Sequence, residues 1–325
     1  MNLLQRLLLF SVLTSGLVAC TPSGTSSQYP NRPITYIVPW SPGGGTDISA
    51  RALAVTLQNV LGQPVNVVNR TGGGGVVGHL ALAQAQPDGY TIGAVTVEIT
   101  MMHWMGQTDL APTSYTPLGN LMNNSATITV RADAPWQNLQ EFIEAVKESP
   151  GAFQASGTSR GGIWDLARIG FLQALDLPES ALPWVPSQGA APAMQELLAG
   201  GVDVVTSAIA EVDAMRQAEK VRVLGVMAEE RLDRFPDIPT MKEQGVDWTT
   251  GGWVGIGAPK NLPEPIRQKL DSAIQVAFLD PAYLDPMNTA GFQLDPRDGG
   301  AFNQLMQRQD SINGAILKSA GLAKE

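Results

Sequence analysis

The chain has 325 residues, of which 44% are hydrophobic and 16% are charged, with a formal net charge of -9 and an isoelectric point near 4.8. This acidic balance argues against a nucleic acid or an anionic membrane surface as a partner, because the overall field would repel both. An anionic ligand would for the same reason need local hydrogen-bond donors. About 300 residues remain after the N-terminal segment, enough for two domains with separate cores.

The N-terminal segment is typical of an export signal. Arg6 precedes an apolar run over residues 7–18, which is shorter than the ~20 residues that a membrane span requires. The run ends in Leu17-Val18-Ala19-Cys20, which resembles the signal of bacterial lipoproteins, whose cysteine is lipidated and becomes the new N-terminus. We therefore expect residues 1–20 to be a lipoprotein signal peptide and residues 21–28 to be a flexible, polar tether.

The cysteine count supports lipidation. Cys20 is the single cysteine of the sequence, so no internal disulfide can form, and a free thiol is a liability in an oxidising compartment. Attachment of a lipid would consume that thiol. The alternative is an ordinary signal peptide that is cut nearby, with Cys20 discarded.

The first part of the mature chain alternates short strands, glycine turns and amphipathic helices. Residues 34–38 are the first expected strand, and the turn S-P-G-G-G-T-D over residues 41–47 follows. The next helix, which Gly62 ends, has apolar residues at positions 50, 53, 54, 57, 60 and 61. A strand, a turn and a helix recur at residues 65–68, 72–75 and 76–85, and residues 90–95 are a third strand. This alternation predicts a parallel sheet with right-handed crossovers.

A second set of units begins near Val130. Asn138 and Glu141 predict a capping box that opens a helix over residues 139–148. A strand at 153–155, a glycine turn at 156–162 and a helix at 163–175 follow. Next come the turn 187–189, a helix with Pro192 in its first turn and Gly200 past its end, and strands at 202–206 and 221–227.

The last part of the chain is expected to return to the first domain. Residues 253–258 are predicted to form a strand, and helices are predicted at 263–279 and 302–319. We therefore expect a discontinuous domain 1, residues 29–129 plus 253–325, and a domain 2, residues 130–252. The two crossings between them would act as a hinge.

The glycine turns are candidate anion sites. Each ends a strand and opens a helix, so its N–H groups lack intrahelical partners and lie at the positive end of the helix dipole. Ligands of parallel α/β sheets bind at this edge. Turns from both domains that face one cleft would hold both ends of a dicarboxylate, although a single such turn is more often only a tight turn.

Several side chains beside these turns have two open interpretations. The hydroxyls of Ser41, Thr46, Ser156, Thr158, Ser159 and Ser187 are hydrogen-bond donors to a ligand or N-caps of their own helices. Asp47 is expected to stabilise the first helical turn, with orientation of a water or a ligand amine as the alternative. Arg160 is a carboxylate partner or a solvated loop residue. Trp40, Trp164 and Trp253 are walls of the cleft or core residues.

Two enzyme classes compete with a binding function. Residues 157–161 match the G-x-S-x-G nucleophile elbow, but both histidines, His79 and His103, precede Ser159, and a hydrolase triad requires a later one. Gly73-x-Gly75-x-x-Gly78 matches the dinucleotide fingerprint, with Glu98 about 20 residues beyond, and leaves an exported Rossmann-type oxidoreductase as the alternative. Neither a His/Cys metal site nor a Walker A lysine is available in the sequence.

A series of short motifs resembles the receptors of tripartite tricarboxylate transporters, the Bug or TctC family of solute-binding proteins. In the first half these are P-G-G-G-T-D at 42, G-Q-P-V at 62, N-R at 69, G-G-G-G at 72 and P-D-G-Y at 87. In the second half they are A-S-G-T at 155, G-A-A-P-A at 189, L-L-A-G-G-V-D-V at 197, R-V-L-G-V-M-A at 222 and F-P-D-I-P-T at 235. The resemblance covers residues 29 to about 322.

The resemblance implies an α/β fold of the periplasmic-binding-protein type (type II, Venus flytrap), with two doubly wound domains. It implies capture of a small carboxylate, delivery to two integral membrane subunits of a tripartite transporter, no catalysis and no cofactor. With Cys20 it implies a lipid-anchored receptor in the periplasm or on the outer face of the cell membrane, expected to be monomeric. The predicted ligand-binding residues are Trp40, Ser41, Pro42, Gly43, Gly44, Gly45, Thr46, Asp47, Gly73, Gly74, Ser156, Gly157, Thr158, Ser159, Arg160, Gly162, Trp164, Asp165, Ser187, Gln188, Gly189 and Ser207.

Three positions depart from the family pattern. Thr71 stands where the family commonly has Pro, Asp165 where a His is common, and Ser207 where an Asp is frequent. Because Asp165 and Ser207 are expected on the domain 2 side of the cleft, we hypothesise a ligand other than plain citrate, with an amine or hydroxyl that faces Asp165.

Overall fold

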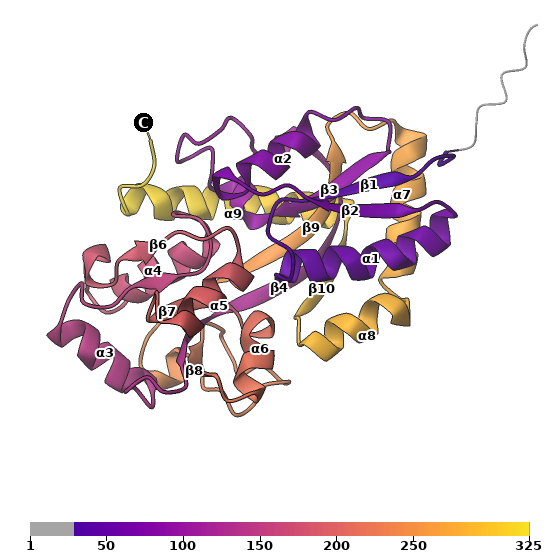
Figure 1. The fold of residues 1–325 in the computed structure, drawn as a ribbon. Helices are drawn as coiled ribbons and strands as arrows, with labels where there is room; N and C mark the ends of the chain where they lie inside the picture. The colour runs from indigo at the N-terminus through magenta and orange to yellow at the C-terminus, as the bar shows by residue number, and fades with distance from the viewer. Residues whose placement is uncertain (1–28, 325) are drawn as a thin grey trace, which may run out of the picture.

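One mixed sheet of ten strands organises residues 29–324, the part of the chain that the computed structural model describes (Figure 1). Eight strands follow the order β2-β1-β3-β9-β4-β7-β5-β6, and β8 and β10 each pair with β4. The predicted signal peptide, Cys20 and the tether lie outside the described residues. The strands are β1 Ile34–Val38, β2 Val65–Asn69, β3 Thr91–Thr96, β4 Tyr115–Arg131, β5 Ala155–Ser156, β6 Trp184–Val185, β7 Val204–Ala208, β8 Val221–Val226, β9 Gly251–Pro259 and β10 Leu294–Asp298.

Helices cover this sheet (Figure 1). They are α1 Gly45–Leu61, α2 Val76–Ala83, α3 Leu139–Glu148, α4 Ile163–Gln173, α5 Ala190–Ala199, α6 Ile209–Gln217, α7 Glu264–Ala277, α8 Pro281–Ala290 and α9 Gly299–Ser319. Within residues 29–324, none of them is both long and apolar enough to cross a membrane.

The strands fall into two groups that the long strand β4 connects. β4 pairs with β9 as far as the register Ser125↔Gly251, and from Ala126 onward it pairs with β7 and β8. We call β1, β2, β3, β9, β10 and the first part of β4 the first strand group. The second strand group comprises β5, β6, β7, β8 and the last part of β4.

Strand directions agree with the prediction in the βαβ units. β1 is parallel to β2 and β3, and β5 is parallel to β6 and β7. β9 runs antiparallel to β3 and β4, and β4 runs antiparallel to β7, β8 and β10. The parallel pairing predicted from the alternation of strands and helices is therefore confirmed for β1, β2 and β3. The sequence pattern predicted no direction for β4, β9 and β10.

Local signals placed most helix ends correctly. In α1 the apolar stripe over residues 50–61 is largely buried, and Gly62 adopts the left-handed conformation at φ 68° that ends the helix. At the start of α3, the Asn138 side chain accepts a hydrogen bond from the Glu141 N–H at 3.0 Å and donates to the Glu141 carboxylate at 2.9 Å. The predicted N-cap is confirmed, but the Glu141 carboxylate accepts from the Gln137 N–H at 2.7 Å and not from the Asn138 N–H, so the reciprocal half of the predicted capping box is not formed.

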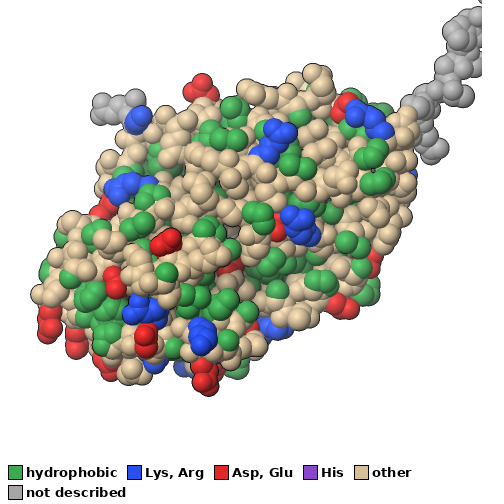
Figure 2. Space-filling model, in the orientation of Figure 1, with side chains coloured by type: hydrophobic (Ala, Val, Ile, Leu, Met, Phe, Trp, Pro, Cys, Tyr) green, Lys and Arg blue, Asp and Glu red, His purple; other side chains and the backbone are tan. Residues whose placement is uncertain are grey.

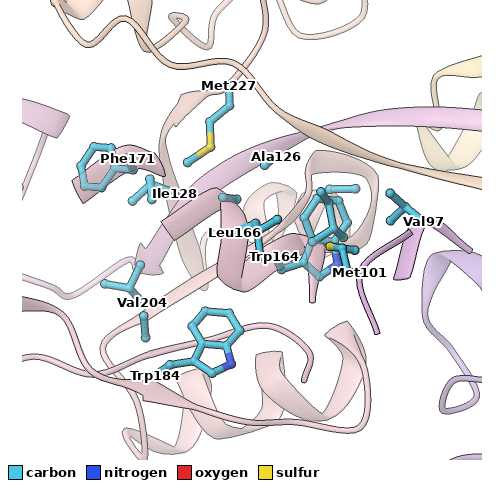
Figure 3. Packing of buried hydrophobic residues seen from close by; sticks show 14 of the residues in the cluster. Val97, Met101, Ala126, Ile128, Trp164, Leu166, Phe171, Trp184, Val204 and Met227 are labelled. Atoms are coloured by element: carbon cyan, nitrogen blue, oxygen red, sulfur yellow. The ribbon is translucent and has the colours of Figure 1, made fainter. Parts of the chain in front are cut away.

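The largest core cluster lies between the two strand groups. It includes Val97 and Met101 from the chain after β3 and Trp164 and Leu166 from α4, which pack close together in Figure 3. Its shared apolar packing holds α4 against the first strand group. On the face shown in Figure 2, basic and acidic side chains are scattered rather than gathered into a single-charge patch.

Candidate ligand-binding site

Residues from both strand groups enclose one cavity at the N-terminus of α1. Its volume is about 50 Å³, whereas one water molecule needs roughly 10–15 Å³, so the cavity has room for a few waters. Eight of the predicted residues line it: Trp40, Ser41, Gly44, Gly45, Thr46, Thr158, Trp164 and Gly189. They come from the first glycine turn, the turn before α4 and the turn before α5.

Aromatic side chains form the walls of the cavity. Trp40, Trp164, Trp253 and Phe292 line it, and each is more than nine-tenths buried. The indole N–H of Trp40 donates to the Thr96 hydroxyl at 3.3 Å, and the Trp253 ring packs edge-on against Phe302 with 5.2 Å between ring centroids. These rings give the cavity large apolar faces with few freely rotating groups.

Two polar groups at the cavity have no hydrogen-bond partner among the described residues. They are the indole N–H of Trp253, whose side chain is 2% exposed, and the hydroxyl of Thr158, which is 4% exposed. Buried polar groups in native proteins are almost always paired, and each unpaired one costs roughly 1–3 kcal/mol. Unpaired groups at a cavity indicate donors that a bound solute would satisfy.

Hydrogen bonds join the two strand groups across the cavity mouth. The Ser41 N–H and hydroxyl both donate to the Gln188 carbonyl oxygen, at 3.3 Å and 3.2 Å. The Gly45 N–H, in the first turn of α1, donates to the Glu211 carboxylate at 2.9 Å. A Cβ on Gly45 would lie 2.8 Å from the Phe292 ring, so glycine is required for this close approach. These contacts hold the two sides of the cavity together.

Two carboxyl groups, Glu98 and Glu211, line the same cavity. Glu98 is 4% exposed and accepts a hydrogen bond from the Thr96 hydroxyl at 2.5 Å. Glu211 accepts from the N–H groups of Gly45 and of Ala208, the latter at 3.1 Å. Burial raises the pKa of both carboxyls, and the charge of Glu98 adds to the rise in the pKa of Glu211.

No basic side chain of the described residues faces these carboxyls. Within residues 29–324, the cavity lining contains no Lys, Arg or His. The imidazole of His79 lies behind Thr96, where its Nε2 accepts from the Thr96 N–H at 3.2 Å and its Nδ1 lies 2.8 Å from the Gly75 carbonyl oxygen. Burial lowers the pKa of His79 to about 4, so it carries no charge at neutral pH.

The raised pKa values predict a pH-dependent stability of the ligand-free protein. A carboxyl with a raised folded-state pKa stabilises the fold fully below its unfolded pKa, ~4.3, and this contribution is lost as the pH rises through the folded-state pKa. We therefore expect the Glu98→Gln/Glu211→Gln variant to gain stability relative to wild type as the pH rises above about 4. Urea unfolding at several pH values above about 4 measures the difference in the free energy of unfolding between variant and wild type. Glu229→Gln, on the exposed surface, is the control. A difference that does not change with pH would contradict the prediction.

Asp165, predicted to face a ligand amine or hydroxyl, instead lies inside the protein. Asp165 is fully buried, accepts from the Gly161 N–H at 2.8 Å and forms an ion pair with Arg168, with 2.6 Å between Oδ1 and Nη2. It does not line the cavity, so no ligand group faces it. A carboxylate four residues after Gly161 on the first turn of α4 folds back onto its own loop and helix.

Other predicted residues also have partners away from the cavity. Asp47 accepts from the Gly43 N–H, Arg51 and Asn69, which is the helix-stabilising role expected of it. Arg160 is exposed and lies 3.5 Å from Glu179. Ser156 and Ser187 donate to the carbonyl oxygens of Val185 and Gly189. The remaining predicted residues that do not line the cavity are Pro42, Gly43, Gly73, Gly74, Gly157, Ser159, Gly162, Gln188 and Ser207.

Several lining residues are not among the predicted ligand-binding residues. The sequence pattern favours Glu98 only for a ribose contact, and it does not separate a wall role from a core role for Trp253. Nothing in the sequence distinguishes Asn124 or Glu211, because both lie in elements, β4 and α6, that were not predicted. The other unpredicted lining residues are Thr96, Val97, Met122, Ile163, Ala190, Ala208, Gly252, Val254 and Phe292.

Comparison with known proteins places the chain in a family. The model of the tripartite tricarboxylate transporter family receptor (TctC) matches residues 49–322. BugT of Bordetella pertussis is 31% identical over 310 residues, which cover 90% of each chain. The structure of the periplasmic binding protein BugD is 30% identical with a TM-score of 0.85, covering 91% of this chain and 100% of that one. MatC of Rhodopseudomonas palustris, solved with bound malate, is 27% identical with a TM-score of 0.82, covering 89% of this chain and 100% of that one.

These matches span nearly all of the described residues, agree with the predicted type II binding-protein fold and give no support to the oxidoreductase alternative. The chain belongs to the TctC family of tripartite tricarboxylate transporter receptors.

Proposed function

We propose that this receptor captures a small organic acid in the closed cavity and delivers it to the two membrane subunits of a tripartite transporter. The observation that carries the proposal is the cavity itself, which residues of both strand groups enclose at the N-terminus of α1. A helix N-terminus favours a negatively charged group. The malate bound to MatC, a relative of the same fold, supports a carboxylate as the ligand.

We infer that the two strand groups move as domains. The proposed units are residues 29–129 plus 253–325 and residues 130–252, and the hinge is formed by β4 and the segment that leads into β9. The three hydrogen bonds from Ser41 and Gly45 would break on opening, whereas the β4–β9 pairing would persist. The hydrogen bonds that join the two strand groups beside this cavity of about 50 Å³ support a motion of this kind, because a solute needs a more open state to enter.

Titration calorimetry and thermal-shift screening test the ligand class. The panel consists of di- and tricarboxylates, acidic amino acids and aromatic acids. NADH is included to test the alternative function, an exported oxidoreductase. We expect at least one organic acid to raise the melting temperature, by mass action on the closed state. Stabilisation by no acid would overturn the proposal.

We further propose that the receptor is a monomeric lipoprotein without catalytic activity, anchored outside the cytoplasm by a lipid on Cys20. Both histidines are engaged away from Ser159: His79 bonds Gly75 and Thr96, and His103 pairs with Asp310 at 3.1 Å. This supports the absence of a hydrolase triad.

Replacement of Cys20 tests the anchor. With Cys20→Ala we expect loss of labelling by radioactive palmitate and a shift of the protein from the membrane to the soluble periplasmic fraction, because one residue supplies the attachment point. Thr14→Ala in the signal region is the matched control and is expected to keep the label. Equal labelling of wild type and Cys20→Ala would contradict lipidation at this residue.

A further inference from the structure

The cavity combines features that a simple dianion would not require. Two carboxyls, Glu98 and Glu211, line a space of about 50 Å³ that is walled by four aromatic rings and, within the described part of the chain, contains no basic side chain. A dicarboxylate in this space would bring its charges against two acidic groups without a countercharge, which is costly where water is excluded.

The chain already supplies a carboxylate to the predicted anion site. Glu211 reaches from α6 of the second strand group to the Gly45 N–H of α1, over a sequence distance of 166 residues. The first donor of this helix N-terminus is therefore occupied by the protein itself when the cleft is closed. Two donors at the cavity that remain for a ligand carboxylate are the Thr158 hydroxyl and the Trp253 indole N–H, neither of which has a partner among the described residues.

We propose that the bound acid also carries an ammonium group, which lies between Glu98, Glu211 and the aromatic rings, while its carboxylate accepts from Thr158 and Trp253. The proposal rests on the proposed function, because it names the subclass of organic acid that the same cavity takes. Carboxylates within hydrogen-bond reach and indole faces within about 6 Å are the two features that stabilise a desolvated ammonium.

The arrangement couples binding to closure. An ammonium between Glu98 and Glu211 cancels the repulsion between two carboxyls that belong to opposite sides of the cleft. It thereby stabilises the contact of Glu211 with Gly45, which exists only in the closed state. A ligand that lacks the cation gives no such differential stabilisation.

Matched acids that differ by one group provide the test. Glutarate and 4-aminobutanoate differ by a carboxylate in place of an ammonium, and succinate and aspartate differ by an added ammonium. By titration calorimetry at neutral pH we expect the ammonium member of at least one pair to bind wild type ten times more tightly or better, since a hydrogen bond to a charged group is worth roughly tenfold to a hundredfold.

Variants of the two carboxyls separate this role from a structural one. Glu98→Gln and Glu211→Gln keep shape and the hydrogen-bond acceptor, and each is expected to reduce the preference for the ammonium member about tenfold while the affinity for the dicarboxylate stays or rises. Glu229→Gln, an exposed carboxylate away from the cavity, is expected to leave the preference unchanged. Circular dichroism verifies that each variant is folded.

The outcomes distinguish the two proposals. Tight binding of a dicarboxylate, with no preference for the ammonium member and no effect of either Gln variant, would overturn the ammonium site and leave organic-acid binding intact. Binding of no acid of either kind would overturn both.

Discussion

Asp165→Asn is expected to destabilise the protein by about 3–5 kcal/mol, because it removes the close partner of the buried Arg168 and leaves only the Glu179 carboxylate, 3.5 Å away, as a countercharge. Arg168 is 1% exposed, and its Nε donates to the Asp165 carboxylate at 2.8 Å. Its Nη1 donates to the carbonyl oxygens of Glu179 and Leu182 at 3.0 Å and 2.9 Å. These carbonyls hold the guanidinium in place after the substitution, so the charge cannot turn toward water.

Urea unfolding followed by tryptophan fluorescence measures this effect. Arg51→Met is the matched control, because Arg51 pairs with Asp47 on α1 but its side chain is 52% exposed, and loss of such a pair costs less than about 1 kcal/mol. The double variant Asp165→Asn/Arg168→Met is expected to lose less free energy of unfolding than the two single variants lose together, because it removes both charges of the pair. If Asp165→Asn lowered the free energy of unfolding by less than about 1 kcal/mol, the buried ion pair would contribute no more to stability than an exposed ion pair does.

The buried position of Asp165 shows why the residues of the site could be predicted only in part from the sequence. Its position just after a glycine turn favoured a cleft residue, and the sequence carries no signal that Arg168, one helical turn on, would be buried with it. Pairing of two charges at an i,i+3 spacing is usual on helix surfaces. Only the packing of residues 179–182 over α4 makes this pair internal.

Strand β4 shows what the fold prediction lacked. Its sequence, Tyr115 to Arg131, contains Pro117, Gly119 and three asparagines, which are typical of loops. The structure accommodates them because the strand is buried between partners: the Asn120 amide donates to the Asp295 carbonyl oxygen at 2.9 Å, and Asn124 accepts from the Gln293 N–H at 2.9 Å. These partners lie more than 160 residues away, beyond the reach of local patterns.

The glycine turns were predicted because their signal is local. Strand, turn and helix recur with the turn residues in sequence order, and the turns at 41–47, 156–162 and 187–189 all contribute residues to the cavity. Glu98 and Glu211 instead come from a short 3-10 segment and an unpredicted helix. Their proximity follows from the packing of the two strand groups against each other, which no periodicity encodes.

Trp253→Phe is expected to weaken ligand binding about tenfold to a hundredfold, while the smaller ring at this buried position costs about 1–2 kcal/mol of stability. The substitution keeps the aromatic wall and the packing on Phe302 but removes the indole N–H, which has no partner among the described residues. Deleting an unsatisfied buried donor costs the ligand-free protein no hydrogen bond, whereas a hydrogen bond from this donor to a carboxylate is worth roughly 1.5–3 kcal/mol. Calorimetry with the best-binding acid and thermal unfolding measure the two quantities.

Trp184 supplies a matched control, since its indole N–H also lacks a partner among the described residues and is buried, but it does not line the cavity. Trp184→Phe should change the affinity little. If both variants lost affinity equally, the effect would be one of packing, and the N–H of Trp253 would have no role in binding. If only Trp253→Phe lost affinity, the indole N–H of Trp253 would be a direct hydrogen-bond donor to the bound carboxylate.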